Sequence, residues 1–161
     1  MTREDFGIEG PIQSRIDEAV ANQDVIFKDT FPGNLGVRVT SASFGRASGT
    51  LDVDARVRHP GGYAHGGALA GFGDTLAAWA TFPSLEPDEI FTTIEFKANF
   101  ISGVRTGTIT GEATAIHKGR RTMVIDVKIA QGDQLVAVMM VTQAIIRKPG
   151  VTQEEVAPDE E

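Results

Sequence analysis

One segment of the chain, residues 66–82, constrains the fold more than any other. Its larger apolar residues recur at steps of three and four, as they do on one face of an α-helix. The positions between them are mostly small or apolar, and Asp74 is the one acidic residue among them. Because a helix that is apolar on nearly every side is surrounded by protein, we predict a long buried helix. Its small side chains indicate close contact with a sheet or with a second copy of the same helix.

The rest of the chain is typical of one antiparallel sheet. Apolar and polar residues alternate between residues 93 and 100, which indicates a strand that is buried on one face. Short turns join the later strands, and such turns are possible only between antiparallel neighbours. A helix wrapped by one strongly curved antiparallel sheet is the α+β arrangement called the hotdog fold. The remaining predicted elements are an amphipathic helix at about 11–27, a hairpin of 35–42 with 46–57, and strands at 107–117, 122–130 and 135–146.

The composition favours one soluble cytoplasmic domain. The chain has 161 residues, enough for a single core, and no cysteine, which excludes disulfides and thiolate metal sites. Residues 151–161 are rich in acidic residues and contain no base, whereas the rest is nearly neutral, which argues against a nucleic-acid partner. The N-terminus lacks the apolar core of a signal peptide, and no apolar run is long enough for a membrane span. We predict one domain over residues 1–146 and a disordered tail over 147–161.

The glycine-rich run before the long helix, HPGGYAHGG, indicates an oxyanion site. Gly66 and Gly67 lie at the predicted helix N-terminus, where backbone N–H groups lack helical partners and the helix dipole adds positive potential. Without side chains, the two glycines admit a carbonyl oxygen to these donors. The three histidines of the chain do not have the spacing of metal ligands, so no metal is expected.

Three stretches, HGGALAGFGDTLAAWA, TTIEFKANFI and AIHKGRRTMVIDVKI, occur in an order that is typical of one family. Over residues 35–146 the chain resembles the hotdog-fold acyl-CoA thioesterases of the phenylacetate-degradation type. The resemblance implies hydrolysis of an acyl-CoA thioester, with no cofactor other than the coenzyme A of the substrate. It implies that Asp74 acts as nucleophile or general base and that the Gly66 N–H polarises the thioester carbonyl.

The resemblance also implies supporting residues. Thr93, or Thr92 in the alternative register, would assist the water or the carboxylate, and His65 would help to position the site. His59 stands where the family often has Asn or Gln, and a neutral imidazole donates a similar hydrogen bond. Each of these residues also has a simpler interpretation as part of a cap, a loop or an ordinary strand.

The spacing of Gly66 and Asp74 has a geometric consequence. Eight residues of one helix separate them by about 12 Å along its axis, so Asp74 cannot reach a carbonyl held by Gly66 of the same chain. Two antiparallel copies of the helix would bring each Asp74 close to the Gly66 of the other chain. We therefore predict a homodimer with two interfacial sites, and a homotetramer built as a dimer of dimers.

A basic turn supplies the candidate contacts for coenzyme A. The turn is either a solvated hairpin tip or a contact for the phosphates, which arginine binds through paired donors. Gly67 and Asn99 are further candidates for substrate contact. The residues of the turn are Lys118, Gly119, Arg120 and Arg121.

The sequence leaves the acyl group and two other functions open. Small residues on the long helix admit a small aromatic or a short- to medium-chain acyl group. A non-catalytic acyl-CoA-binding module on the same fold would not need Asp74. Hydratase or dehydratase chemistry would require a catalytic histidine, for which His65 or His59 could be recruited.

Overall fold

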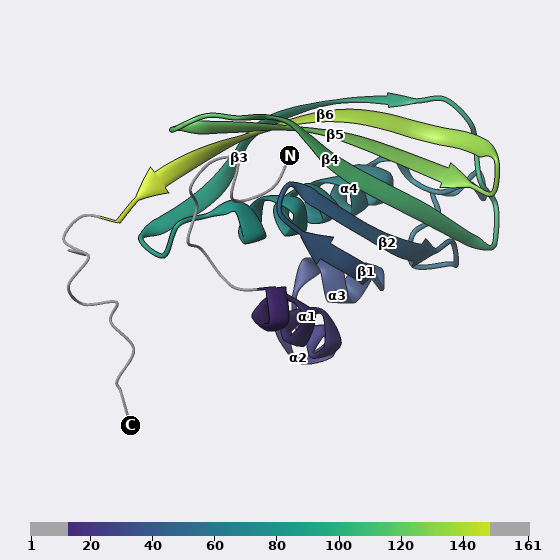
Figure 1. Cartoon of the computed structure of the whole chain (residues 1–161). Coiled ribbons are helices and arrows are strands. Elements are labelled where there is room, and N and C mark those ends of the chain that lie inside the picture. The colour runs from purple at the N-terminus through teal and green to yellow at the C-terminus, as the bar shows by residue number, and fades with distance from the viewer. Residues whose placement is uncertain (1–12, 149–161) are drawn as a thin grey trace.

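The computed structural model describes residues 13–148 of the chain. Figure 1 shows a strongly curved sheet that wraps around one long helix, α4. In chain order the elements are α1 Gln13–Ala21, α2 Gln23–Ile26, α3 Phe31–Leu35, β1 Arg38–Ser43, β2 Arg46–Asp52, α4 Gly66–Thr81, the short 3-10 helix Phe82–Ser84, β3 Glu89–Phe100, β4 Thr108–Lys118, β5 Thr122–Gln131 and β6 Gln134–Arg147.

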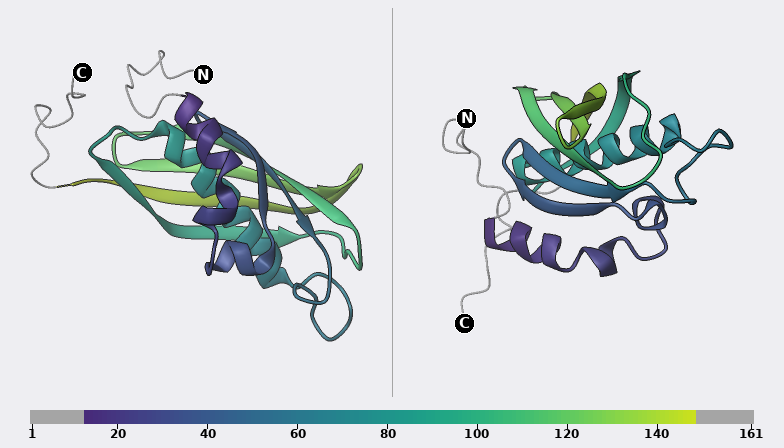
Figure 2. Two further views of the ribbon diagram at one scale, coloured as in Figure 1. Left: turned by 90° about the horizontal axis from the view of Figure 1, so that it is seen from below. Right: turned by 90° about the vertical axis from the view of Figure 1, so that its right-hand side faces the viewer.

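The predicted α+β hotdog arrangement is confirmed. Within residues 13–148, six strands form one antiparallel sheet in the order β1-β2-β4-β5-β6-β3. Helix α4 lies inside the curve of this sheet, as the end-on view of Figure 2 shows. Phe72 and Leu76 of α4 are completely buried in the core between helix and sheet. Small residues allow this close packing, since a Cβ at Gly73 would overlap the Met139 sulfur on β6.

The N-terminal helix predicted over residues 11–27 is wrong as one continuous element. Within the described residues it is divided at Asn22, whose φ of −96° and ψ of 16° lie outside the helical range, into α1 and α2. Asparagine competes for backbone hydrogen bonds and is unfavourable inside a helix. The break turns Gln23 inward, where its side chain is buried against β1.

The predicted hairpin is also shorter at both ends than residues 35–42 and 46–57. Its first strand begins only at Arg38, because the residues before it form the short helix α3. Thr30 caps this helix, and Gly36 ends it in the left-handed conformation with a φ of 82°. The second strand ends at Asp52, and residues 53–65 form a loop that leads into α4.

Strand β3 contains a β-bulge that its alternating sequence does not reveal. Thr93 pairs with Gln143 of β6, whereas Glu95 pairs with Thr142, so Ile94 is an inserted residue. The insertion reverses the side to which the following side chains point. Thr93 therefore faces α4, on the same side of the sheet as the later apolar residues of β3, although simple alternation assigns it to the opposite side.

The predicted half-buried strand is confirmed only in part for the described residues, because Phe91 and Ala98 of β3 pack partly buried against the core while three larger apolar residues do not. Ile94, Phe96 and Phe100 keep 59%, 46% and 53% of their surface exposed. Strand β3 is an edge strand of the sheet, and among residues 13–148 no strand pairs with its outer edge.

The two edges of the sheet differ in how they are protected. At the β1 edge, the Gln23 amide donates to the Val39 carbonyl (2.8 Å) and accepts from the Val39 N–H (2.7 Å). Gln13 donates to the Ala42 carbonyl of the same strand at 2.8 Å. The outer edge of β3 has no such partner among the described residues. A long uncovered edge is a template for pairing with another chain.

None of the helices in residues 13–148 is long and apolar enough to cross a membrane. Residues 1–12 and 149–161 lie outside the described residues, and with them nearly all of the predicted tail. The domain boundary at residue 146, the disorder of the tail and the cytoplasmic location stay predictions.

Candidate active site

The N-terminus of α4 presents one free backbone donor. His65 is the N-cap, and its Nδ1 accepts the Gly67 N–H at 2.8 Å. No acceptor for the Gly66 N–H is found among residues 13–148. Phe100 of β3 lies beside this donor, because a Cβ at Gly66 would be 3.0 Å from its ring atom Cε2. The Gly67 N–H, a predicted substrate contact, is therefore hydrogen-bonded to the cap residue, and the Gly66 N–H remains available to a ligand.

His59 lies close to this donor, in the loop that leads into α4. Its Nδ1 accepts the Gly61 N–H at 2.9 Å, so Nε2 is the position that carries the proton of a neutral ring. The ring stacks on Tyr63 with 6.1 Å between centroids and lies 6.4 Å from the His65 ring. His59, His65 and Gly66 therefore gather at one end of α4.

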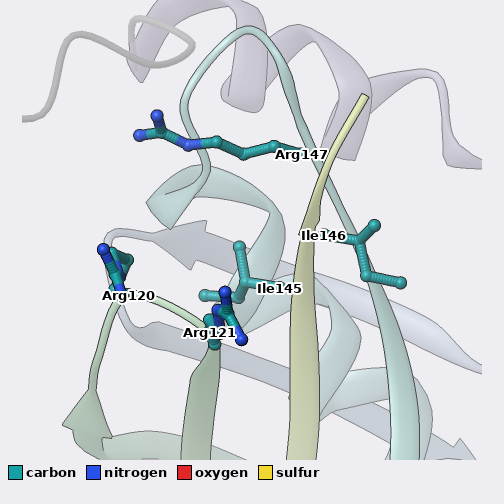
Figure 3. Close-up of a pocket in the computed structure, with 5 residues that line it drawn as sticks. All are labelled: Arg120, Arg121, Ile145, Ile146 and Arg147. Carbon is teal, nitrogen blue, oxygen red and sulfur yellow. The ribbon is translucent and has the colours of Figure 1, made fainter. Parts of the chain in front are cut away.

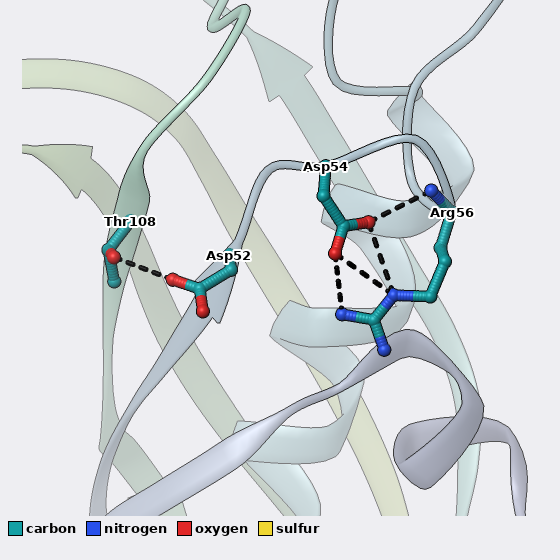
Figure 4. A network of polar contacts seen from close by, with 4 residues as sticks. All are labelled: Asp52, Asp54, Arg56 and Thr108. Carbon is teal, nitrogen blue, oxygen red and sulfur yellow. Dashed lines mark hydrogen bonds and ion pairs between the residues drawn. The ribbon is translucent and has the colours of Figure 1, made fainter.

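Hydrogen bonds hold the start of the same loop in place (Figure 4). Asp54 accepts from the Arg56 side chain, with 2.7 Å between Oδ2 and Nη2, and from the Arg56 backbone N–H at 2.9 Å. Hydrogen bonds from the Arg56 side chain hold the pKa of Asp54 below its ordinary value, and the same bonds raise the pKa of Arg56. Thr108 of β4 donates to Asp52 at 2.6 Å and ties the end of β2 to the sheet.

Asp74 lies in the middle of α4 and is held by Thr93 of β3. The Thr93 hydroxyl donates to Asp74 Oδ1 at 2.8 Å, and Gln143 Nε2 of β6 donates to Thr93 Oγ1 at 3.4 Å. Thr92, the alternative in the other register, is exposed and points away from the helix. The contact with Asp74 depends on the bulge at Ile94, because without it Thr93 would share a face with Glu95 and the other polar residues of β3.

Asp74 belongs to a half-buried row on α4. Ala70, Asp74 and Ala78 follow one another at intervals of four and share one face, whereas most other positions of the helix are buried. Since Asp74 touches Thr93 of the edge strand, this face lies next to the uncovered edge of the sheet. The alanines on either side leave space for a second helix to approach.

Gly66 and Asp74 do not form one site within a single chain. Helix α4 runs without interruption from Gly66 to Thr81. The two residues are consequently about 12 Å apart along its axis. Within one chain, the Gly66 N–H donor thus lies at the start of α4 and the Asp74 carboxylate lies in the middle of the same helix.

A cavity of about 360 Å³ lies between the β4–β5 turn and the end of β6 (Figure 3). The Ile145 N–H donates to the Arg121 carbonyl at 2.9 Å and joins the turn to β6. Arg147 Nε lies 3.8 Å from Glu89 Oε1, but its side chain stays largely exposed. Three guanidinium groups surround the cavity, and that of Arg147 also lies 3.9 Å from Asp88 Oδ2. Its lining consists of Arg120, Arg121, Ile145, Ile146 and Arg147.

Comparison with known proteins identifies the family. The model of the thioesterase superfamily matches residues 61–138. A 1,4-dihydroxy-2-naphthoyl-CoA hydrolase of Listeria monocytogenes is 33% identical over 115 residues, which are 71% of this chain and 94% of that protein. The chain belongs to the thioesterase superfamily. The resemblance predicted from the three sequence stretches is confirmed, and the protein is a thioester hydrolase.

Two further similarities agree with this assignment. The proofreading thioesterase EntH of Klebsiella pneumoniae is 30% identical to this thioesterase over 95 residues, 59% of this chain and 69% of that protein. The crystal structure of a thioesterase from Haemophilus influenzae superposes with a TM-score of 0.75 at 26% identity, over 80% of this chain and 90% of that one. A relative found by sequence and one found by structure are thus both thioesterases.

Three residues that were predicted to contact the substrate lie away from Gly66 and Asp74 or form other contacts in the structure. The Lys118 side chain is only 7% exposed, and its Nζ lies 3.9 Å from Glu89 Oε2 in an ion pair. The Gly119 N–H donates to the Thr122 carbonyl at 2.8 Å and closes the turn. Asn99 is exposed on the outer face of the sheet, since the next residue points toward α4. No group of three His, Cys, Asp or Glu side chains within residues 13–148 is arranged to hold a metal ion.

Two residues near these groups were not predicted. Gln143 interrupts the inward-facing row of β6 between Val141 and Ile145, and such a polar residue in an apolar alternation is a signal that the sequence does contain. Arg147 joins the arginines of the turn only because β5 and β6 pair in the observed register.

Proposed function

We propose that this thioesterase hydrolyses an acyl-CoA at an interface between two copies of the chain, with Asp74 as general base or nucleophile. The observation that carries the proposal is the position of Asp74. Its carboxylate is held by Thr93 on a half-buried face of small residues, directly beside an uncovered sheet edge. A carboxylate in such a place is a candidate for chemistry rather than for folding.

A second copy of the chain is the partner that fits this face. A two-fold axis beside β3 would pair the two β3 edges antiparallel and cover the exposed Ile94 and Phe96. The same axis would set the two α4 helices antiparallel, with Ala70 and Ala78 admitting the neighbour. Each Asp74 would then lie close to the Gly66 of the partner chain. A tetramer would join two such dimers without changing these sites.

The chemistry follows from the two groups. The Gly66 N–H of one chain would donate a hydrogen bond to the thioester carbonyl oxygen, and the helix dipole would stabilise the negative charge of the tetrahedral intermediate there. In the general-base route, Asp74 of the other chain takes a proton from water while the water oxygen bonds to the carbonyl carbon. Collapse of the intermediate breaks the carbon–sulfur bond, and the proton goes to the departing thiolate. In the nucleophilic route, an Asp74 carboxylate oxygen bonds to the carbonyl carbon and the carbon–sulfur bond breaks, which releases the coenzyme A thiolate and leaves a transient anhydride; water then cleaves the anhydride to the free acid and the Asp74 carboxylate.

His59 would take the place of an orienting amide. Its Nε2–H is directed by the Gly61 bond to Nδ1, and its ring is stacked on Tyr63. A fixed N–H donor beside the Gly66 N–H would orient the carbonyl or the water as the amide of Asn or Gln does.

The arginine cavity would hold the phosphates of coenzyme A. Its Arg147 is four residues from Gln143 along β6, which is about 13 Å for an extended strand. Gln143 contacts Thr93, so the cavity is separated from Asp74 by a distance that an extended pantetheine arm can span. Arg120 and Arg121 would bind phosphate oxygens through paired N–H donors. Coenzyme A would enter as part of the substrate, with no further cofactor.

The acyl group would be a small aromatic one or a short- to medium-chain one. The Phe100 ring lies beside Gly66 and favours an aromatic group, because aromatic rings in contact attract one another when they stack with an offset or meet edge to face. The name of the Listeria hydrolase, with its naphthoyl substrate, supports the same class.

The test is release of free thiol from a panel of aromatic, short-chain and long-chain acyl-CoAs. The Asp74→Asn variant should lose about 10²- to 10⁴-fold in kcat. Asp126→Asn, which removes a carboxylate from the outer face of β5, is the matched control and should retain wild-type turnover. Wild-type turnover by Asp74→Asn refutes the site. Binding without turnover would instead favour a binding module, and a hydroxyacyl product would favour hydratase chemistry.

A further inference from the structure

We infer that Gln143 is a positioning residue that directs the hydroxyl proton of Thr93 toward Asp74. The inference rests on the proposed role of Asp74. It concerns a chain of three side chains, in which the Gln143 amide donates to Thr93 and Thr93 donates to Asp74.

The position of Gln143 is unusual for a polar residue. It is completely buried on the inner face of β6, where the flanking inward residues are Val141 and Ile145. In the sheet it stands between Met123 of β5 and Thr93 of β3. Packing alone would be served by an apolar side chain of similar length, because a buried amide costs free energy unless it is fully hydrogen-bonded.

The amide of Gln143 is only half satisfied. Nε2 donates to Thr93 Oγ1, but Oε1 is buried and has no hydrogen-bond partner among the described residues. An acceptor left unpaired in the interior destabilises the fold. Gln143 lowers the stability of the fold in this way and also contacts Thr93, which holds Asp74. A role in the site therefore explains its presence better than a role in packing.

The hydrogen-bonding capacities of the two groups explain what Gln143 does. A threonine hydroxyl has one proton to donate, and the NH₂ of glutamine only donates. With Nε2 directed at its oxygen, Thr93 cannot send its proton toward Gln143 and sends it to Asp74. An apolar residue at position 143 would leave the hydroxyl free to rotate. A carboxylate at that position would compete with Asp74 for the proton.

The experiment is a double-mutant cycle of Gln143→Met with Thr93→Val, measured by thiol release from benzoyl-CoA. Gln143→Met alone should lower kcat about fivefold, the effect of one neutral hydrogen bond, and leave KM unchanged. Because Gln143 acts through Thr93, the same substitution in the Thr93→Val background should have no further effect. Gln143→Glu should lower kcat more than Gln143→Met. The control is Met123→Leu, on the opposite neighbour of Gln143, which should change the melting temperature but not kcat.

Two results would overturn the inference. One is wild-type kcat in Gln143→Met, and the other is an equal loss in the wild-type and Thr93→Val backgrounds, as a purely structural residue would give. A melting temperature of Gln143→Met at or above that of the wild type excludes misfolding as the cause of lost activity. Asp74→Asn, assayed alongside, separates the two proposals: if it retains turnover, the proposed site fails, and if only Gln143→Met does, the positioning role alone fails.

Discussion

Replacement of Gly66 by proline tests the proposed oxyanion donor without disturbing the helix. Proline is favoured at the first position of a helix and has no backbone N–H. His65, the residue before it, has a φ of −72° and a ψ of 135°, the extended conformation that a residue before proline prefers. The added ring would meet Phe100, whose Cε2 lies 3.0 Å from the Cβ position. Gly66→Ala makes the same contact but keeps the N–H, so it is the matched control.

The expected effect is the loss of one oxyanion donor. Such a donor lowers the barrier by about 3 kcal/mol, so Gly66→Pro should have a kcat about 10²-fold below that of Gly66→Ala. KM should change little, because the bond strengthens mainly as the negative charge develops on the oxygen. The assay is thiol release at saturating acyl-CoA, with melting temperatures measured for both variants.

Mixing two inactive variants then tests whether the site lies between chains. Gly66→Pro and Asp74→Asn are refolded together in equal amounts. Random pairing makes half of the dimers mixed, and each mixed dimer has one intact site, with Asp74 from one chain and Gly66 from the other. The mixture should regain about a quarter of the wild-type activity per chain.

A mixture that stays as inactive as its two components would refute the interfacial site. The same conclusion follows if Gly66→Pro and Gly66→Ala have equal kcat values, because the N–H would then have no role in the transition state. Size-exclusion chromatography of the mixture checks that dimers have formed.

Three further predictions follow from the same contacts. Thr93→Val should lower kcat about 30-fold, the effect of a lost hydrogen bond of about 2 kcal/mol to a carboxylate, whereas Thr92→Val, one residue away on the outer face, should not. Arg121→Gln should raise KM about fivefold at unchanged kcat, because it removes a contact to the phosphates. Added salt should also raise the wild-type KM, since salt screens phosphate contacts at an exposed cavity. The control is Arg46→Gln, which removes an exposed arginine on β2 that does not line the cavity. Because the pKa of Asp54 lies below its ordinary 3.8, its pair with Arg56 should contribute to stability above about pH 4 and lose that contribution as the pH falls through the lowered pKa. Urea unfolding of the wild type and of Asp54→Asn between pH 2.5 and 7, roughly the range over which this carboxyl titrates, should therefore converge at the acid end; curves that stay parallel would contradict this.

The sequence was sufficient for elements that depend on local patterns. Helix α4 follows from apolar residues at helical spacing, and its start follows from the glycines after His65. Strands β4, β5 and β6 follow from alternation and from glycine-containing turns, which is why the hotdog fold could be predicted. The N-terminal region was less predictable, because α3 depends on a cap at Thr30 and a left-handed Gly36 rather than on periodicity.

The candidate site could be predicted only in part. Asp74 and Gly66 are conspicuous in the sequence itself, one as an acid on an apolar helix and the other at the start of that helix. The contact of Asp74 with Thr93 depends on a single inserted residue, Ile94, which reverses the alternation of β3. The alternating pattern does not reveal such an insertion and by itself places Thr93 on the outer face, so that only the family resemblance pointed to Thr93 as a site residue.

The sequence by itself therefore determined which elements form, that one buried helix carries a carboxylate, and that about 12 Å separates this carboxylate from the helix N-terminus. These properties depend on residues that are close together along the chain. Only the tertiary structure decided which residues from distant segments meet: Thr93 and Gln143 near Asp74, Phe100 near Gly66, and Arg147 near the basic turn. Strand pairing sets these contacts, and a shift of the register by one residue would turn each of these side chains to the opposite face of the sheet.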